Sequence, residues 1–415
     1  MTAPPDRLVV AGAGLAGLCA VEGARAGGFE GSITLIGAED RPPYDRPPLS
    51  KAFLEPGLVP PAVTTFRAAE QLADDLGVTY LRGRRAVALR FASRHVLLDS
   101  GEALSYDRLI VATGAHPLRI DGDEPTGVVT LRTPVGAQRV REALERGARI
   151  VVVGASVIGS EIASAARSRG LPVTMVFEEP VPMGRTFGLA AGHVCALLHE
   201  RAGVELRAGN RVVSLATRAG RVTGVVLSEG GTIDADLVVV ELGTAPSTAW
   251  LEGSGLMLHP RDRGVVCGPD LRTSLPDVWA CGDVAHAPWA SIGGDLLRVE
   301  QWRSAVEQGF VAGRNAIGRG LVTTFTGTPT RTSGWHGHRI RFSGSPHYDE
   351  TVSIGAPGSG HVILYRRDET LGGVFSVDDV PNETDLHDLV GHPASWSKAM
   401  SSVGEGAPLP VSGDL

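Results

Sequence analysis

The sequence has little cysteine and no cysteine pair of the redox type. Its four cysteines are Cys19, Cys195, Cys267 and Cys281, and none of them form a C-x-x-C or C-x4-C pair. A redox-active disulfide or a cysteine-based metal site needs spacings of that kind. We therefore expect four reduced, mostly buried thiols and no metal centre.

Long apolar runs and an excess of positive charge are also missing. No apolar run reaches the roughly 18 residues that a membrane span requires, and the N-terminus lacks the basic and apolar regions of a signal peptide. The net charge of −7 argues against non-specific binding of nucleic acid, but it leaves room for small anionic ligands held by local basic groups. These absences predict a cytoplasmic protein that binds neither membrane nor nucleic acid. They leave the oligomeric state open.

The chain is long enough for more than one hydrophobic core. Its 415 residues exceed what one compact core usually holds, so two or three domains are expected. The hydrophobic fraction of 43% and the charged fraction of 20% are typical of a globular protein.

The stretch Arg7–Lys51 carries the clearest pattern. An apolar strand leads into a G-x-G-x-x-G turn, an Ala-rich helix to about residue 26 and a second strand that ends near Glu39. In a dinucleotide-binding unit, Gly12 allows the tight turn, Gly14 lets the backbone approach a pyrophosphate, and Gly17 lets the helix pack on the strand. Glu39, 22 positions after the third glycine, is placed to bind a ribose. A merely structural glycine turn is the alternative.

A proline-rich segment, Arg41–Lys51, follows the ribose-binding position. Its four prolines exclude the interior of a helix or strand. We expect an extended loop that holds Arg46 and Lys51 rigidly, against the alternative of a surface linker with incidental charges.

A second unit of the same kind begins about 140 residues later, with a strand at 149–153, a glycine turn at 154–159, a helix and a strand at 173–177. Ser156 stands at the second glycine position, which crowds the approach to a phosphate. Phe177 stands where a ribose-binding acid would end the strand, although Glu178 and Glu179 follow at once, and Arg185 could supply positive charge. This pattern favours a second nucleotide site, against a Rossmann-like domain that has lost it.

The remaining segments are assigned more coarsely. A buried strand at 106–111 ends in a small-residue turn, and Gly282-Asp283 follows a strand at 278–280, where a carboxylate can accept hydrogen bonds from a polyol. Strands at 204–208, 211–216 and 223–228 suggest an antiparallel excursion. From about residue 326 the pattern predicts a small α+β region, and 404–415 a loose Gly/Pro-rich tail.

Several motifs in this order resemble one family. They are the first glycine turn, the second glycine turn, and the segments Pro43–Lys51, Ala112–Gly114, Leu131–Thr133, Cys281–Val284 and Arg298–Trp302. Together they resemble the FAD-dependent ferredoxin reductases of oxygenase systems, within the glutathione-reductase-like superfamily. The resemblance covers residues 7–380 or so, and the proline-rich loop is its sharpest part.

The resemblance implies an α/β fold with two Rossmann-like domains, for FAD and NAD, and a small α+β C-terminal domain. The expected boundaries are 1–118 and 243–325 for the FAD domain, 119–242 for the NAD(P) domain and 326–403 for the C-terminal interface domain. It implies an NADH-dependent reductase that passes electrons through FAD to a ferredoxin-type iron–sulfur protein.

The same resemblance, with the motifs above, gives the expected site. A lysine and a glutamate, Lys51 and Glu161, would lie near the flavin and nicotinamide, and Trp335 would cover the flavin. The residues expected to bind FAD are Gly12, Gly14, Ala16, Gly17, Ala38, Glu39, Arg46, Lys51, Ala86, Thr113, Arg132, Gly282, Asp283, Glu300 and Trp302. Those expected to bind the nicotinamide nucleotide are Gly154, Ser156, Ile158, Gly159, Glu178 and Gly243.

Three departures from the family pattern keep other functions open. Two are Ser156 and Phe177. The third follows Trp335, where the family has Asp and Gln and this chain has His336, Gly337 and His338. One alternative is a repurposed FAD-dependent oxidoreductase acting on a small molecule, with weakened NAD(P)H use and with the two histidines as acid–base groups. Another is a flavoprotein that mainly binds a partner. The histidines could equally be exposed turn residues.

Overall fold

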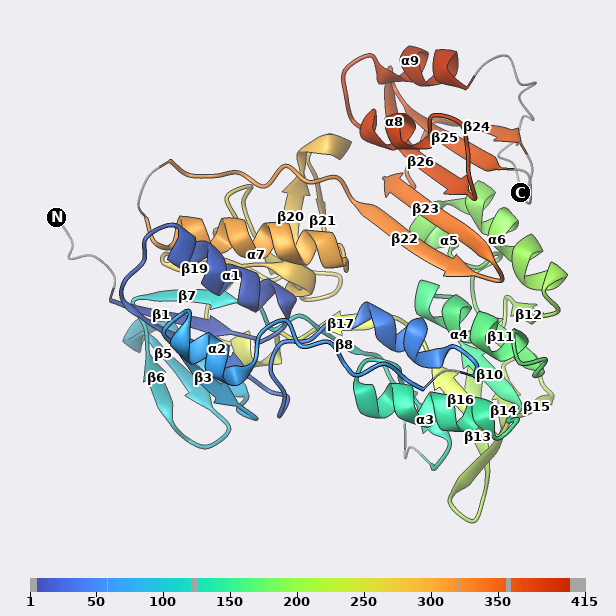
Figure 1. Cartoon of the computed structure of the whole chain (residues 1–415), viewed down its shortest axis with the longest axis horizontal. Helices are drawn as coiled ribbons and strands as arrows, with labels where there is room; N and C mark the ends of the chain where they lie inside the picture. Colours follow the sequence, from blue (N-terminus) through green and yellow to red (C-terminus); the bar gives the residue numbers. More distant parts are fainter. Residues whose placement is uncertain are drawn as a thin grey trace. The chain divides into compact units, whose positions relative to one another are not determined.

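A computed structural model describes residues 6–57, 59–120, 122, 125–318, 321–355 and 360–403. The chain divides into two compact units (Figure 1). Unit 1 comprises Met1–Asp45, Val63–His116 and Thr244–Pro329, and unit 2 comprises Arg46–Ala62, Pro117–Gly243 and Thr330–Leu415. The predicted tail, 404–415, lies outside the described residues.

Unit 1 is built on a five-stranded parallel sheet with the order β19-β7-β1-β2-β3. Near-continuous apolar runs suit strands that are covered on both faces. The strands are β1 (Arg7–Ala11), β2 (Ser32–Gly37), β3 (Val78–Arg82), β7 (Arg108–Val111) and β19 (Val278–Ala280). β1 and β2 are the two strands expected on either side of the first glycine turn and its helix.

Two helices pack side by side on this sheet, α1 (Leu15–Ala26) and α7 (Trp302–Ala316) (Figure 1). Glycines let their backbones approach closely, because a Cβ on Gly313 would lie 2.0 Å from the Ala20 carbonyl oxygen. Unit 1 also contains α2 (Ala69–Asp74) and the antiparallel strands β4 (Ala86–Arg90), β5 (His95–Leu98) and β6 (Ala103–Ser105). Its remaining strands are β8 (Ala115–Pro117), β17 (Thr244–Pro246), β18 (Val265–Val266), β20 (Ala285–Trp289) and β21 (Asp295–Leu297).

Unit 2 repeats the arrangement with a second parallel sheet, of order β12-β11-β10-β16-β9. Its strands are β9 (Val128–Val129), β10 (Ile150–Val153), β11 (Val173–Phe177), β12 (Glu205–Ala208) and β16 (Leu237–Val240), and its helices are α3 (Pro134–Glu145), α4 (Val157–Arg167), α5 (Gly184–Phe187) and α6 (Leu189–Arg201).

The predicted antiparallel excursion is correct for two of its three strands. β13 (Val212–Arg218), β14 (Arg221–Leu227) and β15 (Thr232–Asp234) form an antiparallel sheet. The strand expected at 204–208 is instead β12, which pairs in parallel with β11. It follows helix α6, and a helical crossover returns the chain in the parallel direction.

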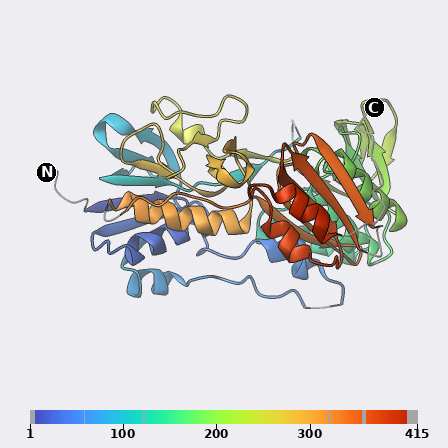
Figure 2. The ribbon, with the colours of Figure 1, turned by 90° about the horizontal axis from the view of Figure 1, so that it is seen from above.

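The C-terminal part of unit 2 is an antiparallel sheet of order β22-β23-β26-β25-β24. Figure 2 shows α8 (Glu383–Asp388) and α9 (Ser395–Ser402) lying over it, where Leu386 and Ala399 are buried against sheet residues such as Val374. The predicted α+β character is confirmed. The strands are β22 (Thr330–Trp335), β23 (His338–Gly344), β24 (Glu350–Gly355), β25 (His361–Arg367) and β26 (Thr370–Val377).

The proline-rich loop is less extended than expected. Pro47–Ser50 and Ala52–Leu54 form short 3-10 turns, because proline is well suited to the first positions of a helical turn. This segment belongs to unit 2, where the Phe53 carbonyl accepts a 2.7 Å hydrogen bond from buried Arg141. The three-domain organisation stays a prediction. Among the described residues, the helices are all too short or too polar to cross a bilayer.

Candidate functional site

The first glycine turn has the geometry that a bound phosphate requires. Gly12 has φ +120°, and a Cβ there would lie 2.1 Å from the Ala112 carbonyl oxygen. A Cβ on Gly17 would lie 1.8 Å from the Gly12 carbonyl oxygen, whereas one on Gly14 would meet nothing within 4 Å. Gly14 caps α1 without a side chain, so the positive end of the helix faces open space. The turn therefore fits a dinucleotide.

Several other residues that are expected to bind FAD lie around this turn. The carboxylate of Glu39, just after β2, accepts a 2.9 Å hydrogen bond from the Tyr44 hydroxyl. Thr113, after β7, donates to the Ser247 carbonyl oxygen at 2.8 Å. Two alanines lie at the same sheet, Ala16 buried on α1 and Ala38 exposed after β2, and Ala86 is buried at the start of β4. Their contacts with a cofactor remain predictions.

A polar cluster follows β19 and centres on Arg298. Its guanidinium contacts the Glu300 carboxylate at 2.6 Å and the Asp283 carbonyl oxygen at 3.1 Å. Glu300 also accepts a hydrogen bond from Thr244. Gly282 has φ +74°, and a Cβ there would lie 2.7 Å from the Ala16 side chain. The predicted Gly-Asp segment therefore packs on α1 at its N-terminal end.

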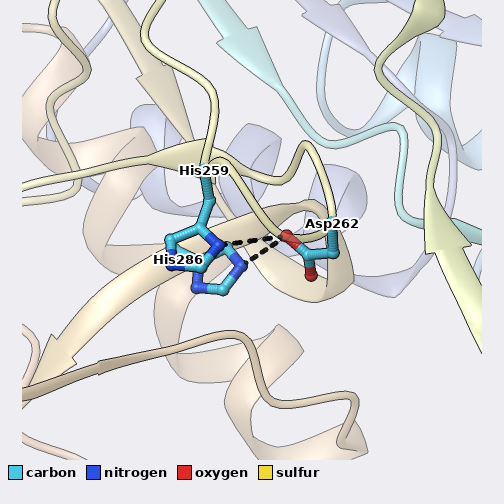
Figure 3. Close-up of side chains that lie close together, drawn as sticks. All are labelled: His259, Asp262 and His286. Carbon is cyan, nitrogen blue, oxygen red and sulfur yellow. Dashed lines mark hydrogen bonds and ion pairs between the residues drawn. The ribbon is translucent and has the colours of Figure 1, made fainter.

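Sequence analysis missed a second cluster, formed by His259, Asp262 and His286 (Figure 3). Asp262 accepts from His286 at 2.8 Å and from Arg298 at 2.7 Å. The two imidazoles stack, with centroids 4.1 Å apart and planes 14° from parallel. A metal ion binds close to the plane of its imidazole ligand, so two stacked rings cannot both direct a lone pair at one ion. The geometry instead fits a hydrogen-bonded network that orients Arg298.

This network predicts a pH-dependent stability. Burial favours a higher pKa for Asp262, but hydrogen bonds from Arg298, the Gly264 N–H and His286 outweigh it and hold the pKa at about 2. A lowered acid pKa stabilises the fold above the ordinary value, and the stabilisation is lost as pH falls towards 2. Asp262→Asn is expected to cost about 1–2 kcal/mol near neutral pH. In urea unfolding, the difference in free energy of unfolding between the unaltered protein and Asp262→Asn should become smaller below about pH 4. A difference that does not change with pH would contradict the lowered pKa of Asp262.

Trp302 begins α7 and keeps a large exposed area. Its indole N–H donates to Asp45 at 3.0 Å, its ring lies edge-on to Phe66, and 48% of the residue is exposed. An exposed tryptophan anchored at one end is available to a ligand, which is consistent with its predicted role.

In unit 2, the predicted pair Lys51–Glu161 is present. The Lys51 ammonium lies 2.7 Å from a carboxylate oxygen of Glu161 on α4, and Glu161 is only 3% exposed. Glu161 also accepts hydrogen bonds from the hydroxyls of Ser50 and Ser333. Three donors from two segments, the loop at 50–51 and β22, hold this carboxylate in position. Ser333, on β22, was not anticipated, and no local signal in the sequence marks it.

Arg46 and Arg132 lie together in the same unit. The Arg46 guanidinium donates to the Arg132 carbonyl oxygen at 2.9 Å. Arg132 precedes α3, whose N-cap Thr133 accepts from the Gly136 N–H. Both arginines are partly exposed, so each is open to a ligand, and their contacts with FAD stay predictions.

The second glycine turn differs from the first in its cap. Gly154 has φ +109° and packs on the Glu241 carbonyl oxygen, as Gly12 does on Ala112. Ser156 closes the N-terminus of α4, because its hydroxyl oxygen accepts a 2.9 Å hydrogen bond from the Gly159 N–H. The same hydroxyl donates to Glu241 at 3.2 Å. Partly exposed Ile158 continues the turn, and exposed Gly243 follows Glu241.

The end of β11 leaves one acid available. Phe177 is buried in the sheet, whereas Glu178 is exposed. Glu179 pairs with Arg185 at 2.9 Å, which neutralises the positive charge expected from that arginine. Glu178 is therefore the acid at this strand end whose side chain is open to solvent, and its contact with a ribose stays a prediction.

The residues around Trp335 differ from expectation. Trp335 is 1% exposed and stacks on His199 within the core of unit 2, so it has no free face as it lies, and its contact with the flavin stays a prediction. His336 bonds to His199 at 2.9 Å, and burial lowers its pKa to about 4. His338 bonds to Asp378 at 2.7 Å. Both histidines already have partners, which weakens their case as acid–base groups.

The four cysteines are free and buried, as predicted. Burial raises the pKa of the Cys19 thiol to about 12 and raises those of the other three further. A thiol with so high a pKa is a poor nucleophile. Disulfide exchange at these positions is therefore disfavoured.

A family model described as pyridine nucleotide-disulphide oxidoreductase matches residues 6–309. The chain belongs to this family. It is 34% identical to the rhodocoxin reductase of Rhodococcus erythropolis over 89% of this chain and 82% of that protein. It is 32% identical to the biphenyl dioxygenase system ferredoxin–NAD(+) reductase component of Paraburkholderia xenovorans (strain LB400), over 87% of each.

Structural similarity agrees with this assignment. The crystal structure of the covalent putidaredoxin reductase–putidaredoxin complex matches with a TM-score of 0.83 and 27% sequence identity, over 92% of this chain and 93% of that one. The predicted fold class, with two Rossmann-like nucleotide units, is thereby confirmed. The disulphide chemistry in the family's name has no counterpart among the buried thiols of this member.

Proposed function

We propose that this protein is an NADH-dependent flavoprotein reductase that passes electrons through FAD to a ferredoxin-type iron–sulfur protein serving an oxygenase. The observation that carries the proposal is the buried Glu161 carboxylate, held by Lys51 and two serines. The names of the relatives, which are ferredoxin–NAD(+) reductases, support it. The putidaredoxin complex of a structural relative supports an iron–sulfur partner.

FAD fits the first glycine turn. The open space beside Gly14 and the uncapped end of α1 suit a pyrophosphate, and the Glu39 carboxylate suits a ribose. Asp283, steadied through Arg298, suits a polyol chain. When bound, FAD supplies an acceptor for a hydride and a donor of single electrons. The FAD and NAD(P) residues and domain boundaries given above are part of this proposal, as is a cytoplasmic location.

Glu161 and its two serine partners fix the position of the positive charge on Lys51. Glu161 pairs with Lys51 and fixes the position of its ammonium group, while the serines keep the carboxylate from turning. Lys51 remains partly exposed, with 41% of its side chain accessible. A cation held in this way stabilises negative charge on a neighbouring ring system without moving a proton.

Stopped-flow mixing of the FAD-loaded protein with NADH tests the proposal. We expect the oxidised flavin band to bleach within seconds, followed by reoxidation when a ferredoxin-type protein is added. If millimolar NADH and NADPH both leave the band unchanged, the repurposed oxidoreductase acting on a small molecule becomes the better hypothesis.

NADH is expected to be preferred over NADPH by about tenfold or more. A 2′-phosphate on the ribose would meet the exposed carboxylate of Glu178 at the end of β11, since Arg185 is already paired with Glu179. The ratio of kcat/KM for the two nucleotides measures the preference. Glu178→Gln should reduce it, while the exposed control Glu200→Gln should not. A preference for NADPH in the unaltered protein would contradict this assignment.

A further inference from the structure

Glu241 occupies a distinctive place in the second nucleotide unit. It follows β16 directly, and its N–H donates to the Val153 carbonyl oxygen of β10 at 2.7 Å. A Cβ on Gly154 would lie 2.1 Å from the Glu241 carbonyl oxygen. The residue thus lies against the glycine turn, at the carboxyl ends of two adjacent parallel strands. Nucleotide phosphates bind at this edge in a Rossmann-like unit.

The side chain of Glu241 points to the start of α4. Its carboxylate accepts a 3.2 Å hydrogen bond from Ser156, whose hydroxyl oxygen in turn caps the Gly159 N–H at 2.9 Å. The helix N-terminus attracts anions. In the first unit the equivalent end of α1 is open beside Gly14. In the second unit, the protein's own carboxylate already lies there.

Burial and charges of both signs act on the Glu241 carboxylate. Burial raises its pKa to about 7, although hydrogen bonds from Ser156 and from the Leu131 N–H act in the opposite direction. The negative charge of Glu161 on α4 acts in the same direction as burial, and the positive charge of Arg132 before α3 acts against it. Lys51 is engaged by Glu161. The group therefore exchanges its proton in the neutral range, where a neighbouring anion can decide its state.

We propose that Glu241 couples nicotinamide nucleotide binding to the uptake of one proton. The nucleotide pyrophosphate and the Glu241 carboxylate compete for the N-terminus of α4, and two anions there repel each other. Binding of the nucleotide to the ionised protein consumes one solvent proton, which neutralises Glu241 and leaves the nucleotide charge unchanged. This inference rests on the proposed function, because it concerns the same nucleotide site.

The coupling has a definite sign. Above about pH 7, each unit of pH should weaken nucleotide binding about tenfold, and below about pH 6 the affinity should level off. Between about pH 6 and about pH 8.5, the dissociation constant should rise roughly thirtyfold. In Glu241→Gln the amide keeps the shape and cannot ionise, so the dissociation constant should stay nearly flat and match the low-pH value of the unaltered protein.

Isothermal titration calorimetry on the oxidised, FAD-loaded protein measures this directly. A non-reducing tetrahydro analogue of NADH serves as the probe, because it cannot reduce the flavin. Titrations at about pH 8.5 in two buffers with different heats of ionisation give the number of protons taken up. Glu200→Gln, which removes an exposed carboxylate of α6 in the same unit, is the matched control.

The expected result is uptake of close to one proton by the unaltered protein and by the control, and close to none by Glu241→Gln. If the unaltered protein binds the probe with equal affinity at about pH 6 and about pH 8.5 and takes up no proton, the inference is overturned. So would loss of binding in a folded Glu241→Gln, because that result would make Glu241 a ligand contact. If the unaltered protein binds no probe at either pH and NADH does not reduce its flavin, the proposed function fails and the inference fails with it.

Discussion

Gly14→Asp is expected to yield a folded protein that has lost its FAD. Gly14 is the N-cap of α1 with no side-chain hydrogen bond, and its Cβ position is open. Aspartate is a favourable N-cap, so the helix should be kept or even strengthened. Its carboxylate would lie where the pyrophosphate is expected, and two charges about 4 Å apart at a protein surface repel by about 4 kcal/mol. FAD affinity should therefore fall by roughly 10²- to 10³-fold.

Gly14→Ser is the matched control, because it copies the Ser156 cap of the second unit without adding charge. We expect it to retain far more FAD than Gly14→Asp. The measurements are the ratio of flavin to protein absorbance after purification and the far-ultraviolet circular dichroism spectrum. Full flavin content in folded Gly14→Asp would show that the cofactor phosphate lies elsewhere.

The second large effect is expected from Glu161→Gln. This change removes the charge that balances Lys51 but keeps an oxygen that can accept from Ser50 or Ser333. The position of the lysine ammonium should loosen, and electrostatic preorganisation around the reacting rings is typically worth about 10²-fold in rate. The rate of flavin reduction by NADH should fall by roughly that factor, while the FAD content should stay unchanged.

Glu200→Gln again serves as control, because it removes an exposed carboxylate of the same unit. Rapid-mixing kinetics at saturating NADH separate hydride transfer from binding. Reduction at the unaltered rate would remove Glu161 from the reacting site and leave it a structural ion pair.

Much of the fold follows from short-range patterns. Both strand–turn–helix–strand units are recognisable because their glycines must stand at fixed spacings for the turn, the phosphate approach and the helix packing. Gly12 and Gly154 meet the same requirement, since each has a positive φ and packs against the backbone of a neighbouring strand. Such constraints act within about 20 residues of sequence, so they can be recognised from the sequence alone.

The proline-rich loop shows the limit of such reasoning. Four prolines excluded a regular helix or strand, but Pro47–Ser50 still closes a 3-10 turn and packs in unit 2. The strand at 205–208 was likewise expected to be antiparallel and is parallel to β11. In both cases the local residues allow several conformations, and distant packing selects one.

The sequence by itself determined that this protein has two glycine-turn nucleotide units, buried thiols and a flavin-reductase pattern of motifs. Only the tertiary structure decided which carboxylates face the start of α4. Ser333 reaches Glu161 across 172 positions, and Ser156 reaches Glu241 across 85. Hydrogen bonds between such distant residues depend on how helices and sheets pack together, and no local spacing records that packing. An acid directly after the strand at 237–240 was the one visible sign of Glu241, and its meaning came only from the helix that it faces.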